Sequence, residues 1–184
     1  MTTQTRIGLL AALVLAMGAG CQAPEPETVP STTVSVSPVA MMPRCLTNAP
    51  TVNEGDPESV ADTVALLLSC QDSRTDTSPL DAYKRASHYL VESLQPGEEA
   101  QVRGGAAWET LKTNDAYTAI TVAPLWGQTP PATAADVAYA DRQVTITPTS
   151  ESGWKGNPTT AFYNFTLAKK EDGTWRVSNI ATAM

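Results

Sequence analysis

The chain has 184 residues, with 12 Lys or Arg against 19 Asp or Glu, and a net charge of −7 at pH 7. This acidic balance disfavours nucleic acid and anionic lipid head groups as partners, because both bind through neutralising cations. The basic residues are also dispersed, so we expect no nucleic-acid site.

Residues 1–20 have the features of an export signal. Arg6 gives a short basic start, and residues 7–17 form an apolar run. That run is shorter than the roughly 20 residues that a membrane-spanning helix needs, and it suits a secretory signal. Three small residues follow it, so we predict that residues 1–20 are a signal peptide.

Cys21 stands directly after those small residues. The sequence Ala19, Gly20, Cys21 resembles the lipobox of bacterial lipoproteins, although Gly18 stands where that family usually has Leu. The resemblance implies a diacylglycerol on Cys21 and a lipid anchor on the extracytoplasmic face of the cell membrane. Two or more acyl chains hold a protein there stably. The alternative is a secreted protein in which this cysteine is fortuitous.

The segment after Cys21 is predicted to be a linker. Residues 22–53 are rich in Pro, Ser and Thr, and no helical or alternating pattern persists. Such a segment buries too little apolar surface to offset its ordering entropy. We therefore assign 21–55 to the lipidated cysteine and a disordered linker, and 56–184 to one folded domain.

Two further cysteines remain once Cys21 is assigned to lipid. Cys45 and Cys70 form an even pair in a chain exported to an oxidising compartment. We predict a disulfide, which would stabilise the fold by roughly 3 kcal/mol. A metal site is the alternative, but two cysteines and one histidine without Cys-x-x-Cys spacing are a weak pattern. We expect no metal and no cofactor.

Three helices are predicted next in the chain. Asp56-Pro57-Glu58 begins the first, which runs to Cys70. Ser78-Pro79-Leu80-Asp81 begins the second, with Asp81 as the acid of a capping box, and Gln95-Pro96-Gly97 ends it. Its expected apolar stripe comprises Leu80, Tyr83, Ala86, Leu90 and Leu94. A third, short helix covers 106–114 and carries Trp108 and Leu111.

Four strands follow the helices. The segments 117–126, 143–149, 161–168 and 174–181 mostly alternate and are rich in β-branched and aromatic residues. The turn at 171–173 makes the last two a hairpin, with Phe165, Leu167, Trp175 and Val177 available to one core. Pro124 and Pro148 should lie at strand ends, bulges or an edge. This order indicates an α+β domain with helices on one face of a curved antiparallel sheet.

The closing hairpin, FYNFTLAKKEDGTWRVSNI, resembles the nuclear transport factor 2-like fold, also called the cystatin-like cone. The resemblance covers roughly residues 57–181. It implies a cone in which N-terminal helices pack into the curved sheet. Lipoproteins and membrane-tethered domains with this fold are mostly scaffolds or binding modules, so the resemblance says little about chemistry.

Catalytic residues are not indicated. His88, the single histidine, falls on the polar face of the second helix, where it would pair with Glu92 while Asp81 pairs with Arg85. A general base would lie in a pocket beside a partner group. Spacing does not unite the acids Asp62, Asp72, Asp76, Asp115 and Asp141. We predict that the protein is not an enzyme, and that 72–79 joins two helices, with a binding loop as the alternative.

The leading hypothesis is a lipid-anchored, non-catalytic scaffold or interaction module that binds another envelope protein, for example in a secretion or conjugation assembly. The alternative is a binding protein for a small apolar ligand or lipid. An apolar cavity free of charged groups would favour the alternative, and a buried acid beside Tyr or Arg would favour an enzyme. Pocket or interaction residues are predicted at Tyr83, Trp126, Trp154 and Tyr163.

Overall fold

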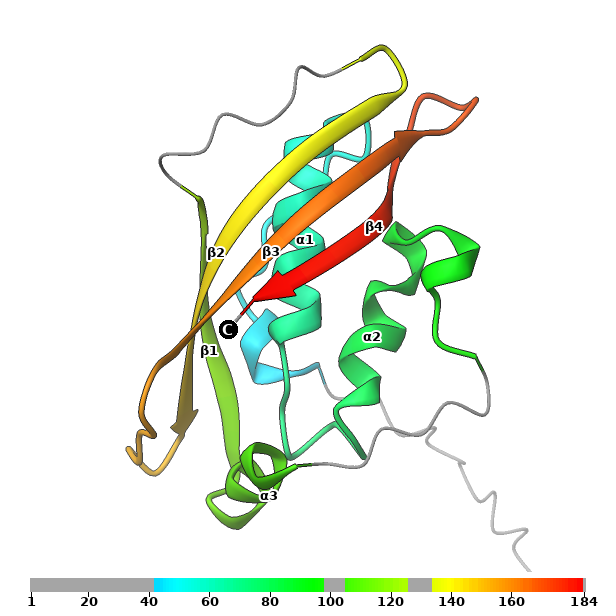
Figure 1. Cartoon of the computed structure of the whole chain (residues 1–184). Helices are drawn as coiled ribbons and strands as arrows, with labels where there is room; N and C mark the ends of the chain where they lie inside the picture. The colour runs from blue at the N-terminus through cyan, green and yellow to red at the C-terminus, as the bar shows by residue number, and fades with distance from the viewer. Residues whose placement is uncertain (1–41, 98–104, 126–133, 184) are drawn as a thin grey trace, which may run out of the picture. The chain divides into compact units, whose positions relative to one another are not determined.

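The computed structural model describes residues 42–97, 105–125 and 134–183 (Figure 1). Contacts divide the chain into Met1–Pro38 and Val39–Met184, and every described residue belongs to the second unit. The predicted signal peptide, Cys21, Trp126 and most of the predicted linker lie outside the described residues. In the described ranges, no helix combines the length and apolarity that a membrane crossing requires.

Helix α1, Pro57–Ser69, begins as its sequence predicts. The side chain of Asp56 accepts a hydrogen bond from the Glu58 N–H at 3.1 Å, and Pro57 occupies the first turn. Its apolar face is fully buried, comprising Val60, Ala61, Val64 and Ala65. Helix α1 therefore forms the centre of the core.

Helix α2, Leu80–Ala86, is shorter than predicted, and 3-10 turns at Ser87–Tyr89 and Glu92–Leu94 follow it. The acid half of the predicted capping box is present, since the Asp81 carboxylate accepts from the Ser78 N–H at 3.2 Å, whereas the Ser78 hydroxyl accepts from the Leu80 N–H at 3.3 Å rather than from Asp81. The helix cannot continue to residue 94 because the Val91 N–H donates to the Val177 carbonyl at 3.0 Å. Pairing with the sheet therefore replaces helical hydrogen bonds there. Helix α3, Ala106–Thr113, forms as predicted.

Four antiparallel strands form one sheet in the order β1-β2-β3-β4. They are β1 Ala116–Pro124, β2 Val137–Ser150, β3 Thr159–Lys169 and β4 Trp175–Ala183. Strand β2 begins well before the predicted residue 143. The buried residues in this first part of β2 are Ala138, Ala140 and Arg142. Two alanines and an arginine do not give the alternation of large apolar residues that predicts a strand, so the sequence did not indicate this part. Pro124 ends β1, and Pro148 lies beyond Ile146, the last β2 residue paired with β3, as expected for proline.

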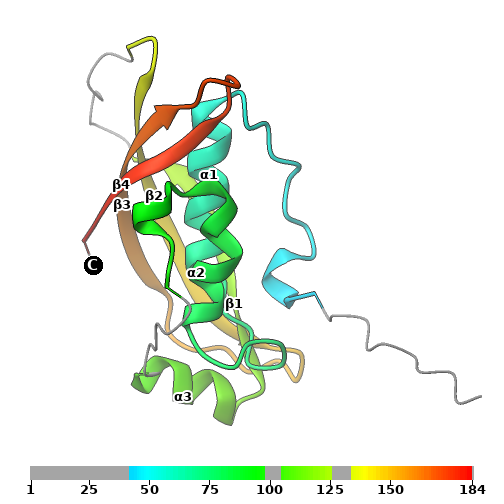
Figure 2. The same ribbon diagram turned by 90° about the vertical axis from the view of Figure 1, so that its right-hand side faces the viewer.

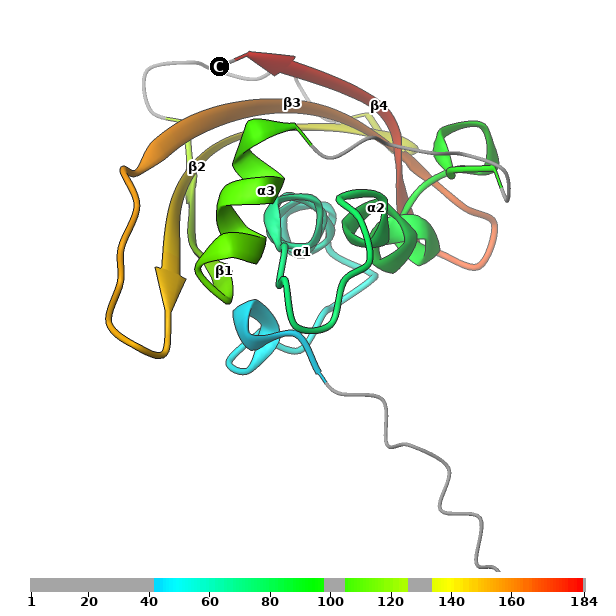
Figure 3. The same ribbon diagram turned by 90° about the horizontal axis from the view of Figure 1, so that it is seen from below.

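The sheet curves around α1, with α2 and α3 on the same face (Figure 3). Helix α1 contacts all four strands. The predicted core residues of the hairpin are all buried, namely Phe165, Leu167, Trp175 and Val177. The predicted fold class, α+β with N-terminal helices on a curved antiparallel sheet, is confirmed.

Residues 43–55, which we call the strap, lie beside α1 (Figure 2). The predicted disulfide is present, with the Cα atoms of Cys45 and Cys70 5.7 Å apart. At the other end of the strap, the Glu54 carbonyl accepts from the Trp175 N–H at 2.8 Å, and Val52 packs against the core. This part of the predicted linker is therefore held against the domain rather than disordered.

Candidate functional site

A pocket of about 470 Å³ lies between the helical layer and the sheet, and we call it the α1–α3 pocket. The end of α1, helix α3, strands β1 to β3 and the loop between β2 and β3 surround it. Its lining residues are Leu68, Ser69, Gln71, Ala107, Thr110, Leu111, Thr118, Ile146, Pro148, Trp154, Gly156, Asn157, Thr159, Ala161 and Tyr163. None of these residues is Asp, Glu, Lys, Arg or His.

Two of the lining residues carry hydroxyls that lie side by side. The Tyr163 hydroxyl lies 3.2 Å from the Ser69 hydroxyl. Burial raises the pKa of Tyr163, and nearby Tyr83 acts in the same direction, although the Ser69 hydrogen bond opposes them. The phenol therefore stays protonated and neutral at physiological pH. The pocket offers hydroxyl hydrogen bonds without a charge.

The hydroxyl of Thr118, which also lines the pocket, is already hydrogen-bonded to the backbone. Thr118 Oγ1 donates to the Ser69 carbonyl at 2.8 Å and accepts from the Gln71 N–H at 2.9 Å. These bonds join β1 to the segment after α1 and satisfy buried backbone groups. Thr118 therefore shapes the pocket wall, while the Tyr163–Ser69 pair is better placed to meet a ligand.

Trp154 supplies an aromatic wall. The loop that carries it is held by the Ser150 N–H, which donates to the Trp154 carbonyl at 2.9 Å. A Cβ atom on Gly156 would lie 3.1 Å from both the Trp154 ring and Pro148, so glycine allows this close approach. The Trp154 side chain also packs against the cluster of Trp108, Leu111 and Ala116.

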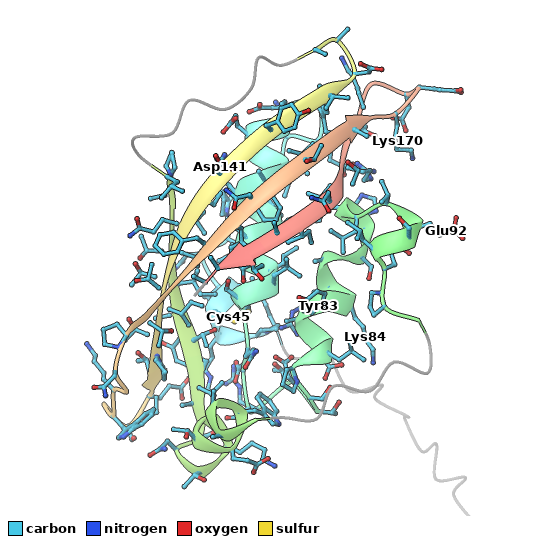
Figure 4. The ribbon with its side chains drawn as sticks, viewed as in Figure 1. Cys45, Tyr83, Lys84, Glu92, Asp141 and Lys170 are labelled. Carbon is cyan, nitrogen blue, oxygen red and sulfur yellow. A yellow bond between two sulfur atoms is a disulfide. The ribbon has the colours of Figure 1, made fainter. Side chains whose placement is uncertain are left out.

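The structure brings together two of the four predicted site residues. Trp154 and Tyr163 line the same pocket. Tyr83, on α2 (Figure 4), is 41% exposed and is not among the lining residues. Trp126 lies outside the described residues. Ser69, Gln71, Thr118 and Asn157 were not predicted as pocket residues, because these polar residues come from separate segments and form no motif.

Buried acids beside arginines do occur, but away from this pocket. Asp72 is fully buried and binds Arg44, with Nη2–Oδ1 at 2.7 Å, while its Oδ2 accepts from the Arg44 backbone N–H at 2.6 Å. Asp76 binds the Arg85 guanidinium through both carboxylate oxygens, and its Oδ2 also accepts from the Asp72 backbone N–H at 2.9 Å. Both carboxylates are occupied by arginines that tie the 72–79 loop to other segments. Their geometry is that of structural ion pairs rather than proton donors facing a substrate.

Burial alone would raise the pKa of Asp72, but hydrogen bonds from Arg44 and from the Arg74 backbone lower it below its usual value. Asp72 is therefore ionised at neutral pH. An ionised carboxylate whose two oxygens already accept several hydrogen bonds is a poor general acid and a poor base.

Two predicted ion pairs are wrong. His88, whose side chain is 60% exposed, contacts Glu54 at 2.9 Å rather than Glu92. Asp81 contacts Lys84 at 3.4 Å, and Arg85 turns to Asp76. The helical spacing failed because α2 ends at Ala86 and because the strap and the 72–79 loop supply closer partners.

No grouping of three or more His, Cys, Asp or Glu suited to a metal ion occurs in residues 42–97, 105–125 and 134–183. The chemistry available around the α1–α3 pocket in these ranges is therefore apolar contact, aromatic contact and neutral hydrogen bonding. These are interactions that bind and orient an uncharged molecule.

Comparison with known proteins adds little to this geometry. No protein-family model matches the sequence, and no curated protein matches it. One similar solved structure is a proposed calcium/calmodulin dependent protein kinase II association domain from Xanthomonas campestris. It has 20% identity and a TM-score of 0.34, and the match covers 73% of this chain and 93% of that chain. At that TM-score the likeness carries no inference about activity or partners.

Proposed function

We propose that this domain binds a small, uncharged, largely apolar molecule in the α1–α3 pocket, outside the cytoplasm and close to a membrane. Lipidation of Cys21 would supply the membrane attachment. The domain would then act as a binding protein rather than an enzyme, holding its ligand near the bilayer from which apolar molecules partition.

The observation that carries this proposal is the absence of any charged residue among the described residues that line a pocket of about 470 Å³. The chain has an acidic surplus, and other described pockets do contain charged side chains. A site without ionic partners favours neutral ligands, because an unpaired ion would lose its hydration there. The Tyr163–Ser69 pair can bind one hydroxyl or carbonyl group of such a ligand.

The hypothesis that this domain binds another protein through an apolar surface has less support. Among the described residues, the exposed large hydrophobic side chains are Met42 and Tyr83. Two separate residues do not make the contiguous apolar patch of several hundred Å² that marks many protein interfaces. We therefore rank ligand binding first.

The test uses the neutral fluorescent probe N-phenyl-1-naphthylamine with the full chain. Thr159 lines the pocket at an exposed position, whereas Thr160 is exposed and does not line it. Because successive strand residues point to opposite faces, Thr159→Trp should block the pocket and Thr160→Trp should not. We expect probe fluorescence to be lost with the first variant and kept with the second.

Equal binding by both tryptophan variants, with unchanged melting temperatures, would contradict the proposal. Tyr163→Phe gives a finer test, because it removes the hydroxyl without opening the apolar wall. Ligands that carry a hydroxyl should weaken by roughly tenfold, the equivalent of a hydrogen bond of about 1.4 kcal/mol, while the probe should be unaffected. Mass spectrometry of organic extracts of the natural protein would then identify the ligand.

A further inference from the structure

A second cavity of about 450 Å³ lies on the other side of α1, along the free edge of β1. We call it the edge groove. Its walls are the strap, α1 and β1. Its apolar lining residues, which we call the floor, are Leu66, Ala49, Pro50, Ala119, Ile120 and Val122, and the lining is completed by Arg44, Cys45, Asn48, Asp62 and Tyr117. Figure 1 shows β1 at one edge of the sheet and β4 at the other.

The backbone of β1 is only partly paired along this edge. The Thr118 N–H donates to the Gln71 carbonyl at 2.9 Å, and the Ala116 carbonyl accepts from the Ser73 N–H at 3.1 Å. The backbone N–H and C=O groups of successive strand residues point to opposite sides. Ile120 and Val122 therefore present these groups to the same side as Thr118, away from β2. In the described ranges, neither residue pairs with another segment on that side. The groove therefore contains strand hydrogen-bonding groups above an apolar floor.

Charge is distributed unevenly around the edge groove. Two cations are buried, with side-chain exposures of 7% for Arg44 and 3% for Arg142, and Arg74, 3.9 Å from Glu151, is 34% exposed. The carboxylates are exposed, at 79% for Asp115 and 68% for Glu151 beside Arg44. At the other end of β1, Asp62 is 51% exposed and is bound to Arg142, which lies opposite Pro124. Both ends of the groove therefore present negative charge to solvent.

We infer that the edge groove binds an extended segment of another polypeptide, which adds as a strand to β1 and carries basic residues at both ends. About six residues, at roughly 3.3 Å each, would run alongside 119–124, beyond the part of β1 that already pairs with residues 71–73. Main-chain hydrogen bonds to Ile120 and Val122 would give affinity, and alternate β-branched side chains would contact the floor. A second copy fits less well, because its β1 would bring another Asp115 carboxylate to an already acidic end.

The test uses three synthetic peptides capped at both ends and the full chain labelled with nitrogen-15. The first peptide is Lys-Thr-Val-Thr-Val-Lys, the second replaces both lysines by glutamate, and the third carries N-methyl groups on its central amides. We expect only the first to shift the amide signals of Ile120 and Val122 at millimolar concentration. The N-methylated peptide keeps the side chains and charge but cannot donate the strand hydrogen bonds.

A pair of protein variants tests the charge argument without disturbing the core. Asp115→Asn with Glu151→Gln should weaken binding of the lysine peptide by roughly fivefold, the upper range for exposed charges. Glu171→Gln with Asp172→Asn removes the same charge at the distant hairpin turn and should leave binding unchanged. Thr159→Trp should also leave it unchanged, which separates this inference from the α1–α3 pocket.

Several outcomes would overturn the inference. One is the absence of any shift at Ile120 and Val122, and another is equal binding of all three peptides. Amide shifts confined to residues of the α1–α3 pocket would show that the peptide binds there through its side chains and does not add to β1. Shifts at Ile120 that grow with protein concentration in the absence of peptide would assign the groove to a second copy.

Discussion

The guanidinium of Arg44 and the carboxylate of Asp72 form a buried pair that is reinforced from the backbone. Nε and Nη2 of Arg44 donate to Asp72 at 3.1 and 2.7 Å, and the Arg44 N–H donates to the same carboxylate at 2.6 Å. The next residue, Cys45, is joined to Cys70. The strap is therefore fixed twice at one point, by an ion pair and by a covalent bond.

Asp72→Asn should lower the free energy of unfolding by about 3–5 kcal/mol, because it removes the buried counter-charge of a buried guanidinium and leaves it, among the described residues, only exposed carboxylates. Asp115→Asn is the matched control, since Asp115 also faces Arg44, at 3.6 Å, but is largely exposed. The control should cost less than about 1 kcal/mol. Urea denaturation at neutral pH, with the disulfide intact, measures both values. Similar losses in the two variants would contradict the structural role of Asp72.

The same carboxylate should make stability depend on acid. Hydrogen bonds from Arg44 and Arg74 outweigh the effect of burial and lower the pKa of Asp72 in the folded state. The pKa of an unfolded Asp is about 3.9. Because the folded-state pKa of Asp72 is lower, its charge stabilises the fold at pH values above about 3.9, and this contribution is lost as the pH falls through the folded-state pKa. Stability should therefore fall between about pH 5 and pH 2.

The Asp72→Asn variant should show a shallower fall over the same range. Some slope should remain, since the hydrogen bond from His88, with Arg176, also lowers the pKa of Glu54. Urea midpoints measured across the acid range test this. An unchanged slope in the variant would mean that Asp72 does not titrate differently on unfolding.

Removing the disulfide should destabilise the domain without affecting the α1–α3 pocket. The bond closes a separation of 25 residues, which corresponds to roughly 3 kcal/mol on the chain-entropy model. A variant with Cys45→Ala and Cys70→Ala should lose about that much and still bind the naphthylamine probe. Mass spectrometry of a nonreduced digest should show one linked peptide pair in the wild type. Two free thiols in the protein isolated from its natural source would refute the bond.

Trp175→Ala and His88→Ala should differ sharply in stability. Trp175 is buried, and its loss should cost about 3–5 kcal/mol. His88 is exposed and has one partner, Glu54, so His88→Ala should cost at most about 0.5 kcal/mol. Thermal melts of both variants decide the point. A Trp175 variant as stable as the wild type would show that the closing hairpin does not depend on this contact.

Cys21→Ser tests the proposed membrane attachment, which concerns residues outside the described ranges. Labelled fatty acid should be incorporated into the wild type and not into the variant, and the variant should be released from membranes. Unchanged labelling would contradict the lipobox assignment. Cys21→Ala should behave as Cys21→Ser does, because neither residue has a thiol.

The sequence was sufficient for features that depend on neighbours in the chain. Asp56 and Asp81 cap helices through local hydrogen bonds, and the alternation around Phe165 and Trp175 identifies a hairpin whose turn is local. The disulfide followed from an even count of cysteines after Cys21 was assigned to lipid. Each of these inferences needs only spacing, residue type or number.

Tertiary structure decided which side chains meet. Arg44 finds Asp72 across 28 positions, His88 finds Glu54 across 34, and Ser69 meets Tyr163 across 94. Strand β2 extends over alanines and Arg142 because α1 supplies Glu58 and Asp62 to neutralise that arginine. Contacts at such separations depend on how a curved sheet packs around a helix. Spacing along the chain carries no record of that packing, so the uncharged pocket and the free edge of β1 became visible only in three dimensions.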